Sequence, residues 1–288
     1  MPEKVGTLII SPHSDDIAFS IGGTLLSHFF PEPLMIVTVF TRSISADYFD
    51  GPRNEKTITA QRGAEDRAYA ARVGSGMVRL GLPEATLCRK TAKELVPLNF
   101  LAYLLWGWGA VPPHPVPEGR ARQLVRRLAA YVPVVERSIF LHRVAEVDSI
   151  HAILRKQLLS LLERYPGVTL VSPLGLGTHA NHVAVAEVCR SLKPLASRLF
   201  FFEDLSYASA YNNRQIRRFV RIFDADLQPV HVGIDSVLAN KIDNSLVYTS
   251  QVRPEDIEKV AAYARGLSHG TGSWERLWTY MDEDKKSR

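Results

Sequence analysis

The chain has 288 residues, of which 46% are hydrophobic and 23% charged, and its formal net charge is +5. Such values are ordinary for a soluble globular protein with one large α/β domain or two small ones. No apolar stretch reaches the roughly 20 residues that a membrane span needs, and the scattered basic residues form no aromatic-interleaved nucleic-acid motif. We therefore expect no membrane span and no nucleic-acid partner. The positive charge is interpreted as solvated surface, with some weight for an anionic substrate.

The two cysteines, Cys88 and Cys189, lie far apart, and neither belongs to a CxxC pair. They fit a reducing compartment, in which burial as small apolar residues is their expected role. The N-terminal residues lead directly into the first predicted strand, without a signal-peptide pattern. These features predict a cytoplasmic protein.

The first 80 or so residues alternate between short apolar runs and longer amphipathic segments. This alternation predicts a Rossmann-like α/β fold, in which helices cover both faces of a mostly parallel sheet. Strands are expected over Val5–Ser11, Pro33–Phe40 and Met77–Leu80, and helices from Asp15 or Asp16 to about Phe30 and over Thr57–Val73.

The segment at about 90–148 breaks this rhythm. Leu98–Val111 is rich in Leu, Trp and Gly, and the proline-rich run that follows it cannot be regular helix. We interpret the segment as a helical or irregular insertion within a single domain of residues 1–288. It either packs on the sheet or forms a wall of the substrate pocket or a homo-oligomer interface, since its Trp and Arg residues are typical of contact surfaces.

The alternation resumes after the insertion. Helices are expected over Ser149–Arg164, Asn181 to about Leu192, Ser236–Tyr248 and Pro254–Gly266, strands over Val168–Leu174 and Leu199–Glu203, and a β-rich section over Gln215–Phe223 and Pro229–Ile234.

Polar residues follow two of the predicted strands at the point where each ends. The first group is Pro12-His13-Ser14-Asp15-Asp16, directly after an apolar run. In α/β proteins functional side chains lie outside the carboxyl ends of the strands. His13 and Asp16 are an imidazole–carboxylate pair suited to a divalent metal, which leaves Asp15 free to act as a base. Taken alone, the two aspartates could equally be a helix N-cap and its dipole support.

The second group decides between these interpretations. Thr178-His179-Ala180-Asn181-His182 follows another β-branched run that ends at Pro173 and a Gly-rich loop. His179 and His182 are spaced i, i+3 at the start of a helix and can face one site. Two strand-end groups that both carry ligand types favour a shared metal site.

Together these motifs resemble P-H-x-D-D and H-x-D/N-H, the paired motifs of the PIG-L/LmbE-like de-N-acetylases, which are related to N-acetylglucosaminyl-phosphatidylinositol de-N-acetylase. The likeness covers most of the chain outside about 87–148. Two positions depart from the pattern: Ile17, where many members carry Glu, and Asn181, where many carry Asp. Further matches to the family's R-x-x-E, L-G-x-P-D, E-D-x-x-Y and K…Y-x-S-Q elements are Arg62–Glu65, Leu80–Glu84, Glu203–Tyr207 and Lys241…Tyr248–Gln251.

The resemblance implies a role for each matching residue. It implies a Zn²⁺ site, with Fe²⁺ or another divalent metal as an alternative, in which a position stays open for water. It further implies that Asp15 is the general base and that His179 stabilises the oxyanion. Arg62 and Glu84 match positions on the substrate side, and Asn181 supports the motif. The implied metal ligands are His13, Asp16 and His182.

The implied reaction is metal-dependent hydrolysis of the acetamide of an N-acetyl amino sugar or sugar conjugate to free amine and acetate. The alternative is a non-catalytic binding or regulatory protein that retains the deacetylase fold, for which Ile17 and Asn181 are the support. A nucleotide- or anion-binding module built on Gly175-Leu176-Gly177 is a weaker third interpretation, because the loop lacks the Lys and the spacing of phosphate loops. We also expect Asn181 to lie beside His179 and, since it carries no charge, to keep that imidazole less readily protonated.

Overall fold

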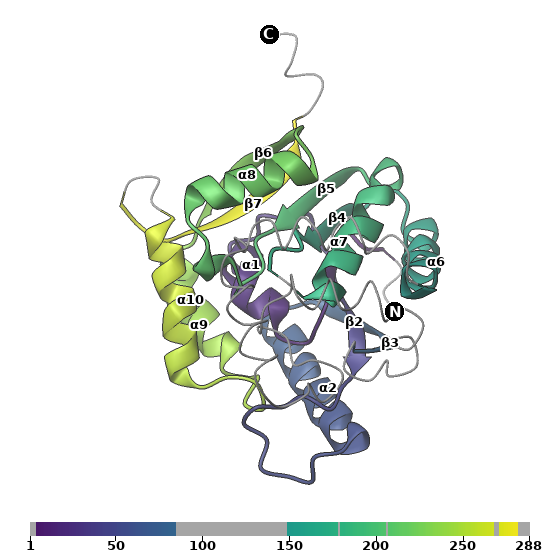
Figure 1. Ribbon diagram of the computed structural model, residues 1–288, viewed down its shortest axis with the longest axis vertical. Helices are drawn as coiled ribbons and strands as arrows, with labels where there is room; N and C mark the ends of the chain where they lie inside the picture. The colour runs from purple at the N-terminus through teal and green to yellow at the C-terminus, as the bar shows by residue number, and fades with distance from the viewer. Residues whose placement is uncertain (1–3, 85–148, 178, 206, 268–270, 282–288) are drawn as a thin grey trace, which may run out of the picture.

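The structure, a computed structural model, describes residues 4–84, 149–177, 179–205, 207–267 and 271–281 (Figure 1). Its centre is a seven-stranded sheet of order β3-β2-β1-β4-β5-β7-β6. The first five strands in this order are parallel, and β7 runs antiparallel to both β5 and β6. The strands are β1 (Thr7–Ser11), β2 (Leu34–Arg42), β3 (Gly76–Pro83), β4 (Thr169–Pro173), β5 (Arg198–Phe202), β6 (Leu227–Gly233) and β7 (Trp274–Tyr280).

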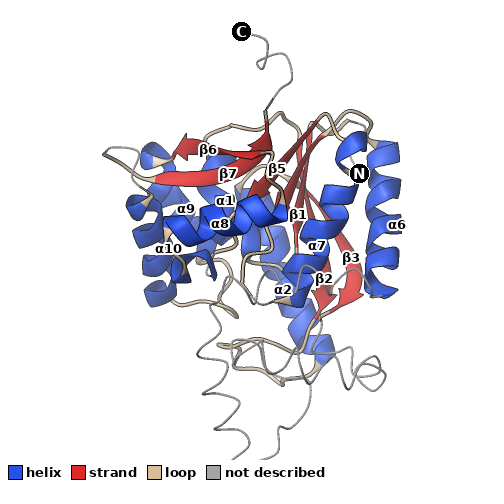
Figure 2. Cartoon of the chain, turned by 45° about the horizontal axis from the view of Figure 1, so that its top comes forward, coloured by secondary structure: helices blue, strands red, loops and turns tan. Residues whose placement is uncertain are grey.

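Helices cover both faces of the sheet (Figure 2). Adjacent residues of β5 show how the faces divide, because neighbouring side chains of a strand point to opposite sides. Phe200 packs on Phe29 and Phe30, just after α1, whereas Phe201 packs on Phe223 of α8. The helices of the α1 face are α1 (Asp16–Leu26), α2 (Glu55–Arg72), α9 (Leu238–Ser245) and α10 (Pro254–Gly266), and those of the α8 face are α6 (Ser149–Arg164), α7 (Ala180–Ser191) and α8 (Asn213–Phe223).

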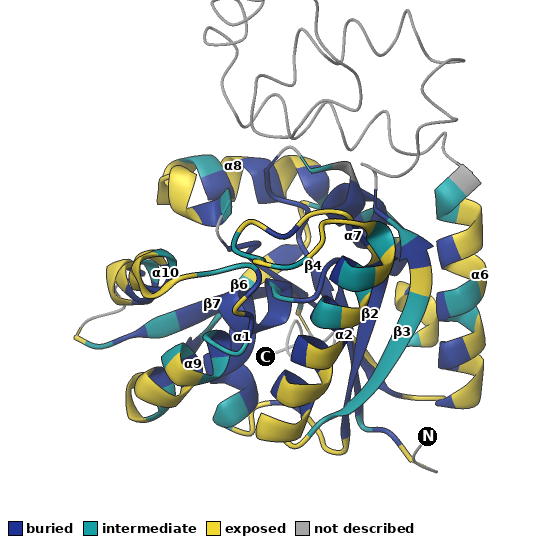
Figure 3. Cartoon of the chain, turned by 90° about the horizontal axis from the view of Figure 1, so that it is seen from below, coloured by how far each residue is buried: buried dark blue, intermediate teal, exposed yellow. Residues whose placement is uncertain are grey.

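The central strands are buried along their whole length (Figure 3). Strands of a parallel sheet covered on both sides read as continuous apolar runs, which is why β1 and β4 have the sequences TLIIS and TLVSP. Strands β1 and β4 pair with each other. The chain leads from β1 outward to β2 and β3 on one side, and from β4 outward to β5 on the other, so the strand order reverses between β1 and β4. Such a reversal point leaves a crevice at the carboxyl ends of the strands, where α/β proteins bind their ligands.

The structure confirms the predicted fold class, a Rossmann-like, mostly parallel sheet between two helical layers. One element differs from the expectation, because residues 213–223 form α8 and not a strand. The apolar residues Ile216, Phe219, Val220 and Phe223 are all buried, and their spacing of three, four and seven residues places them on one helical face. A capping box at Asn212 starts the helix, and this local signal together with the helical spacing of the apolar residues outweighs the β-branched residues of the segment.

Strand β7 was not predicted, and it joins β6 to the parallel strands. The predicted insertion at about 90–148 lies outside the described residues. Within the described residues no helix is both long and apolar enough to cross a membrane. Cys189 is fully buried, as expected, while Cys88 lies outside the described part.

Candidate active site

Three donor atoms from the two predicted motifs form a tight triangle at the carboxyl ends of β1 and β4. His13 Nδ1 lies 3.1 Å from His182 Nε2 and 3.3 Å from Asp16 Oδ2, and the Asp16–His182 separation is 3.4 Å. Ligands about 2.0–2.1 Å from a tetrahedrally coordinated ion lie about 3.3 Å apart. The three side chains therefore fit a divalent cation without rearrangement.

His179 lies beside this triangle. The three imidazoles of His13, His179 and His182 also offer nitrogens within 4.8 Å of one another, so the described residues contain a histidine group that could hold a metal ion. The triangle with Asp16 is the tighter arrangement. His179 is the N-cap of α7, and its Nδ1 accepts the backbone N–H of Asn181 at 3.3 Å. In the neutral ring this leaves the proton on Nε2 as a donor.

The two adjacent carboxylates point in different directions. Asp16 accepts the backbone N–H of His13 at 2.7 Å and takes part in the triangle. Asp15 occupies the N-cap position of α1 but makes no side-chain cap bond; its side chain is 18% exposed, with Oδ1 3.5 Å from Arg62 Nη2. The capping interpretation of the pair therefore does not describe what these carboxylates contact.

Burial and neighbouring charges separate the titration of these groups. Burial raises the pKa of Asp15, and the nearby Arg62 guanidinium only partly offsets this. Burial would also raise the pKa of Asp16, but the imidazoles of His182 and His13 hold it below its usual range. Burial, with His13 and His182 adding to it, lowers the pKa of His179 well below its ordinary value. A charged His179 is therefore disfavoured at this position.

Asp204 is a site residue whose role sequence reasoning missed. Its Oδ1 accepts from Nδ1 of His182 at 2.7 Å, and its Oδ2 accepts the backbone N–H of Leu176 at 2.9 Å. Since a carboxylate accepts, His182 carries its proton on Nδ1 and turns the Nε2 lone pair toward the triangle. The Gly-rich loop Gly175-Leu176-Gly177, which was considered as a phosphate-binding loop, thus donates a backbone N–H to this carboxylate.

The Gly-rich loop approaches one more aromatic side chain. Gly177 has φ +96°, and a Cβ built on it would lie 2.8 Å from Cγ of Tyr207. The Tyr207 ring in turn meets the His182 ring edge-on at 5.4 Å between centroids. Glycine is needed here both for its conformation and for the space.

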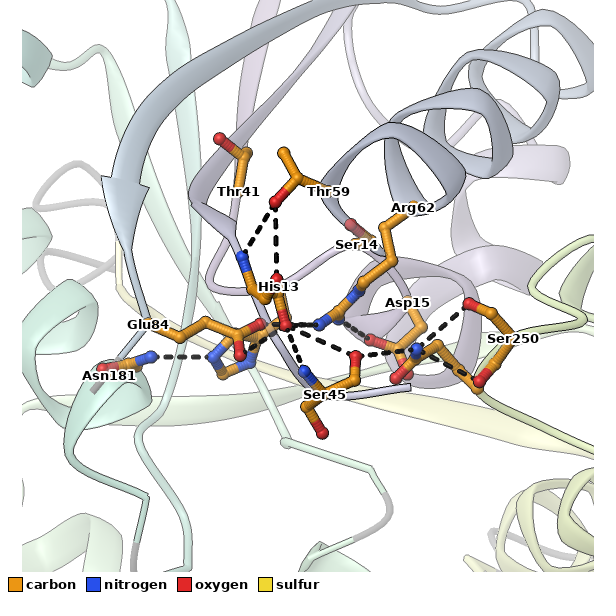
Figure 4. A network of polar contacts seen from close by, with 12 residues as sticks. His13, Ser14, Asp15, Thr41, Ser45, Thr59, Arg62, Glu84, Asn181 and Ser250 are labelled. Atoms are coloured by element: carbon orange, nitrogen blue, oxygen red, sulfur yellow. Dashed lines mark hydrogen bonds and ion pairs between the residues drawn. The ribbon is translucent and has the colours of Figure 1, made fainter. Parts of the chain in front are cut away.

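Arg62 and Glu84 meet beside Asp15 (Figure 4). Arg62 Nη1 donates to Glu84 Oε1 at 2.6 Å and to Ser43 Oγ at 3.1 Å, and Ser43 Oγ donates to Glu84 Oε2 at 2.7 Å. Only 5% of the Arg62 side chain and 6% of the Glu84 side chain are exposed. The structure thus brings both residues to the site, as one buried ion pair.

Other residues of the family-like motifs form hydrogen bonds outside the donor triangle. Glu65 of α2 accepts three hydrogen bonds from Thr249 and Ser250, and so fixes the Y-x-S-Q segment. Glu203 accepts from Tyr263, Arg276 and Trp278, which anchors the end of β5 that carries Asp204. Lys241 forms a buried 2.6 Å pair with Glu275, away from the triangle.

A buried His–His–carboxylate triangle with a separate carboxylate next to it, at the carboxyl edge of a parallel sheet, is an arrangement that metal-dependent hydrolases use. The sequence profile of the PIG-L family, GlcNAc-PI de-N-acetylase, matches residues 8–193. The chain belongs to this family, and the predicted resemblance is confirmed.

Relatives and solved structures agree with this assignment. A 2'-N-acetylparomamine deacetylase of Streptomyces fradiae is 25% identical over 292 residues, covering 95% of this chain and 89% of the relative. A deacetylase of teicoplanin biosynthesis in complex with teicoplanin shares the fold with a TM-score of 0.61, at 15% identity over 97% of this chain and all of that one. The N,N'-diacetylchitobiose deacetylase of Pyrococcus horikoshii gives 0.55, at 15% identity over 94% of this chain and 82% of that one.

Proposed function

We propose that this chain is a zinc-dependent N-deacetylase that hydrolyses the acetamide of an N-acetyl amino sugar or sugar conjugate. The observation that carries the proposal is the donor triangle of His13, Asp16 and His182, with separations of 3.1–3.4 Å. Nitrogen and carboxylate donors in this geometry suit zinc, and three protein ligands leave a position open. Fe²⁺ is the alternative ion, because imidazole and carboxylate also suit it.

The bound ion would polarise the acetyl carbonyl and make the attacking water more acidic. Asp15 lies beside the triangle without being part of it, and its pKa is raised by burial, so it suits a general base. It takes a proton from the water whose oxygen adds to the carbonyl carbon. When the C–N bond breaks, Asp15 returns that proton to the amine and the acyl group leaves as acetate.

His179 is proposed to stabilise the oxyanion. Its Nδ1 is occupied by the backbone N–H of Asn181, so the neutral ring offers Nε2–H to the carbonyl oxygen as negative charge develops there. Arg62, held by Glu84 and Ser43, keeps a positive charge 3.5 Å from Asp15. We propose that Arg62 and Glu84 line the substrate side of the site.

The substrate class rests on the family and its relatives, several of which act on N-acetylated sugars or glycoconjugates. We propose one deacetylase domain over residues 1–288, in which the segment at about 90–148 completes the pocket or a homo-oligomer interface. The widely separated cysteines remain the reason to place the activity in a reducing compartment, the cytoplasm.

The test combines metal analysis with an acetate assay. Protein purified without chelator is expected to hold about one divalent ion per chain, and to release acetate from at least one of a panel of N-acetyl amino sugars, N-acetylated aminoglycosides and inositol conjugates. Asp15→Asn is the matched inactive control. A stoichiometric metal ion without acetate release from any substrate of the panel would favour the non-catalytic alternative. Protein without metal affinity would overturn the proposed zinc-dependent reaction.

A further inference from the structure

Tyr207 lies at the active site, and none of the roles described above uses its hydroxyl. It follows Asp204 by three residues and opens the short 3-10 helix Tyr207–Ala210 after β5. Its ring meets the His182 ring edge-on, with 5.4 Å between centroids, and its centroid lies 6.4 Å from that of His179. Tyr207 therefore packs on a residue of the donor triangle and on the proposed oxyanion donor at once.

The hydroxyl of Tyr207 makes no hydrogen bond to any residue that the structure describes. Tyr207 is partly exposed, and its hydroxyl is not one of the fully buried polar atoms that lack a partner. By contrast, the hydroxyls of Tyr48, Tyr263 and Tyr280 each donate to a carboxylate. A phenol that is fixed by its ring but keeps its O–H unused can donate to a ligand.

The surroundings of the ring show which way the hydroxyl points. A Cβ built on Gly177 would lie 2.8–2.9 Å from Cγ and Cβ of Tyr207, so the Gly-rich loop packs on the base of the side chain. Burial raises the pKa of Tyr207, and the carboxylates of Asp16 and Asp15 add to this. Asp204 adds less, although it is only three residues away in the chain. Because electrostatic effects weaken with distance, the hydroxyl lies on the β1 side, toward the donor triangle and the proposed base.

We propose, building on the deacetylase reaction of the proposed function, that Tyr207 is a further catalytic residue whose hydroxyl donates a hydrogen bond to the acyl oxygen. Negative charge develops on that oxygen when water adds to the carbonyl carbon, and His179 donates to it as well. Phenol and imidazole groups are both used as oxyanion donors in enzymes. The phenol is neutral at neutral pH and keeps its proton throughout, so its role requires no titration.

The packing around Tyr207 suits this role. Gly177 behind the ring and His182 beside it hold the side chain in place before any substrate binds. A donor that is already in position stabilises developing charge without reorganisation at the moment of reaction. The same contacts also allow a simpler role, in which the Tyr207 ring only supports the His182 ring.

Tyr207→Phe separates the two roles, because it keeps the ring and its contacts and removes only the hydroxyl. We expect kcat to fall about 10²-fold, the lower end for loss of one oxyanion donor, since His179 remains. KM and the Kd for zinc should not change. Tyr280→Phe is the matched control: it removes a hydroxyl that donates to Asp224 at 2.7 Å, at the opposite edge of the sheet, and its kcat should equal that of the wild type.

A binding measurement gives a second readout that does not depend on turnover. Methylphosphonate is tetrahedral and anionic, and so resembles the adduct of water and the acetyl group. Its Kd for the zinc-loaded full chain can be measured by calorimetry. We expect Tyr207→Phe to bind it about 10–100-fold more weakly, because a hydrogen bond to a charged acceptor is lost, and Tyr280→Phe to bind it as the wild type does.

The outcomes distinguish this inference from the proposed function. Wild-type kcat in Tyr207→Phe overturns the inference and leaves the proposed function intact, and so does a rise in KM alone, which would assign the hydroxyl to ground-state binding of the sugar. Weaker zinc binding in Tyr207→Phe, or an equal loss in Tyr280→Phe, would assign the effect to packing and also overturn it. If the wild type releases no acetate, the proposed function fails, and the methylphosphonate affinities still decide the role of the hydroxyl. A wild type that shows neither acetate release nor methylphosphonate binding overturns both.

Discussion

Replacing Glu84 by Gln tests whether the buried ion pair beside Asp15 is needed to keep Arg62 inside the protein. The substitution keeps the size of the side chain and removes its charge. Arg62 would retain the Ser43 hydroxyl at 3.1 Å and the Asp15 carboxylate at 3.5 Å, but would lose its 2.6 Å charged partner. Burial alone lowers the pKa of Arg62, and Glu84 and Asp15 reverse this, so the guanidinium depends on these carboxylates to remain charged.

The expected loss of unfolding free energy follows from the burial of the ion pair. Removing one partner of a buried pair typically costs about 3–5 kcal/mol, because the other charge is left uncompensated. Asp15 and the amide oxygen of the new Gln compensate in part, so we expect a loss of about 2–3 kcal/mol in the free energy of unfolding. For a chain of this size that corresponds to a fall of about 4–12 °C in Tm. Arg62 would also move closer to Asp15 and reduce its basicity, so kcat should fall.

The assay is a double-mutant cycle by urea unfolding, with Arg62→Met, Glu84→Gln and the double variant. Since the double variant leaves no unpaired charge between them, its loss should be smaller than the sum of the single losses by about 1.5 kcal/mol or more. Asp243→Asn is the matched control: its partner Arg72 forms a 3.0 Å pair whose side chains are 46% and 76% exposed, so little change is expected. Strictly additive single losses would refute the reasoning.

Four further substitutions address the site and its support. Asp15→Asn should keep the metal and lose about 10²–10⁴ in kcat, whereas Asp16→Asn should lose metal affinity first; equal metal loss in both would contradict the division of roles. Burial raises the pKa of Asp66 to about 7, so unfolding free energy should fall as pH rises from about 4 to 7, and Asp66→Asn should flatten that slope in urea titrations at pH 5 and 7. Gly177→Ala should lower Tm and displace Tyr207, as seen by near-UV circular dichroism, because its Cβ would lie 2.8 Å from the ring; an unchanged Tm would show that the loop adapts.

The two strand-end groups could be predicted because their positions follow from local rules. An apolar run that ends at a polar turn predicts where a buried strand stops, and parallel strands all stop at the same edge of the sheet. This is why His13 and His182, 169 residues apart in the chain, lie 3.1 Å from each other. The strand order that brings β1 next to β4 was not predicted, since periodicity does not define it.

Asp204 and β7 show where this reasoning stops. Glu203 and Asp204 were recognised as a strand-end motif, but the role of Asp204 depends on β5 lying next to β4 and on the Gly-rich loop turning its Leu176 N–H inward. Neither feature has a local sequence pattern. Strand β7 lies between β5 and β6 and pairs with both, and its mixed sequence, WERLWTY, places Arg276 and Trp278 on Glu203.

Asn181 shows that a local rule can correct a prediction drawn from a motif. Its side chain was expected beside His179, but side chains two residues apart in a helix do not face each other, whereas those three apart do. At the start of α7 this spacing places His179 and His182 on one side of the helix. The Asn181 side-chain amide instead contacts His13, and the backbone N–H of Asn181 donates to His179. Loss of the negative charge that many relatives carry at this position therefore acts first on a metal-site histidine. Its consequence should appear in metal affinity before it appears in the basic limb of the pH–rate profile.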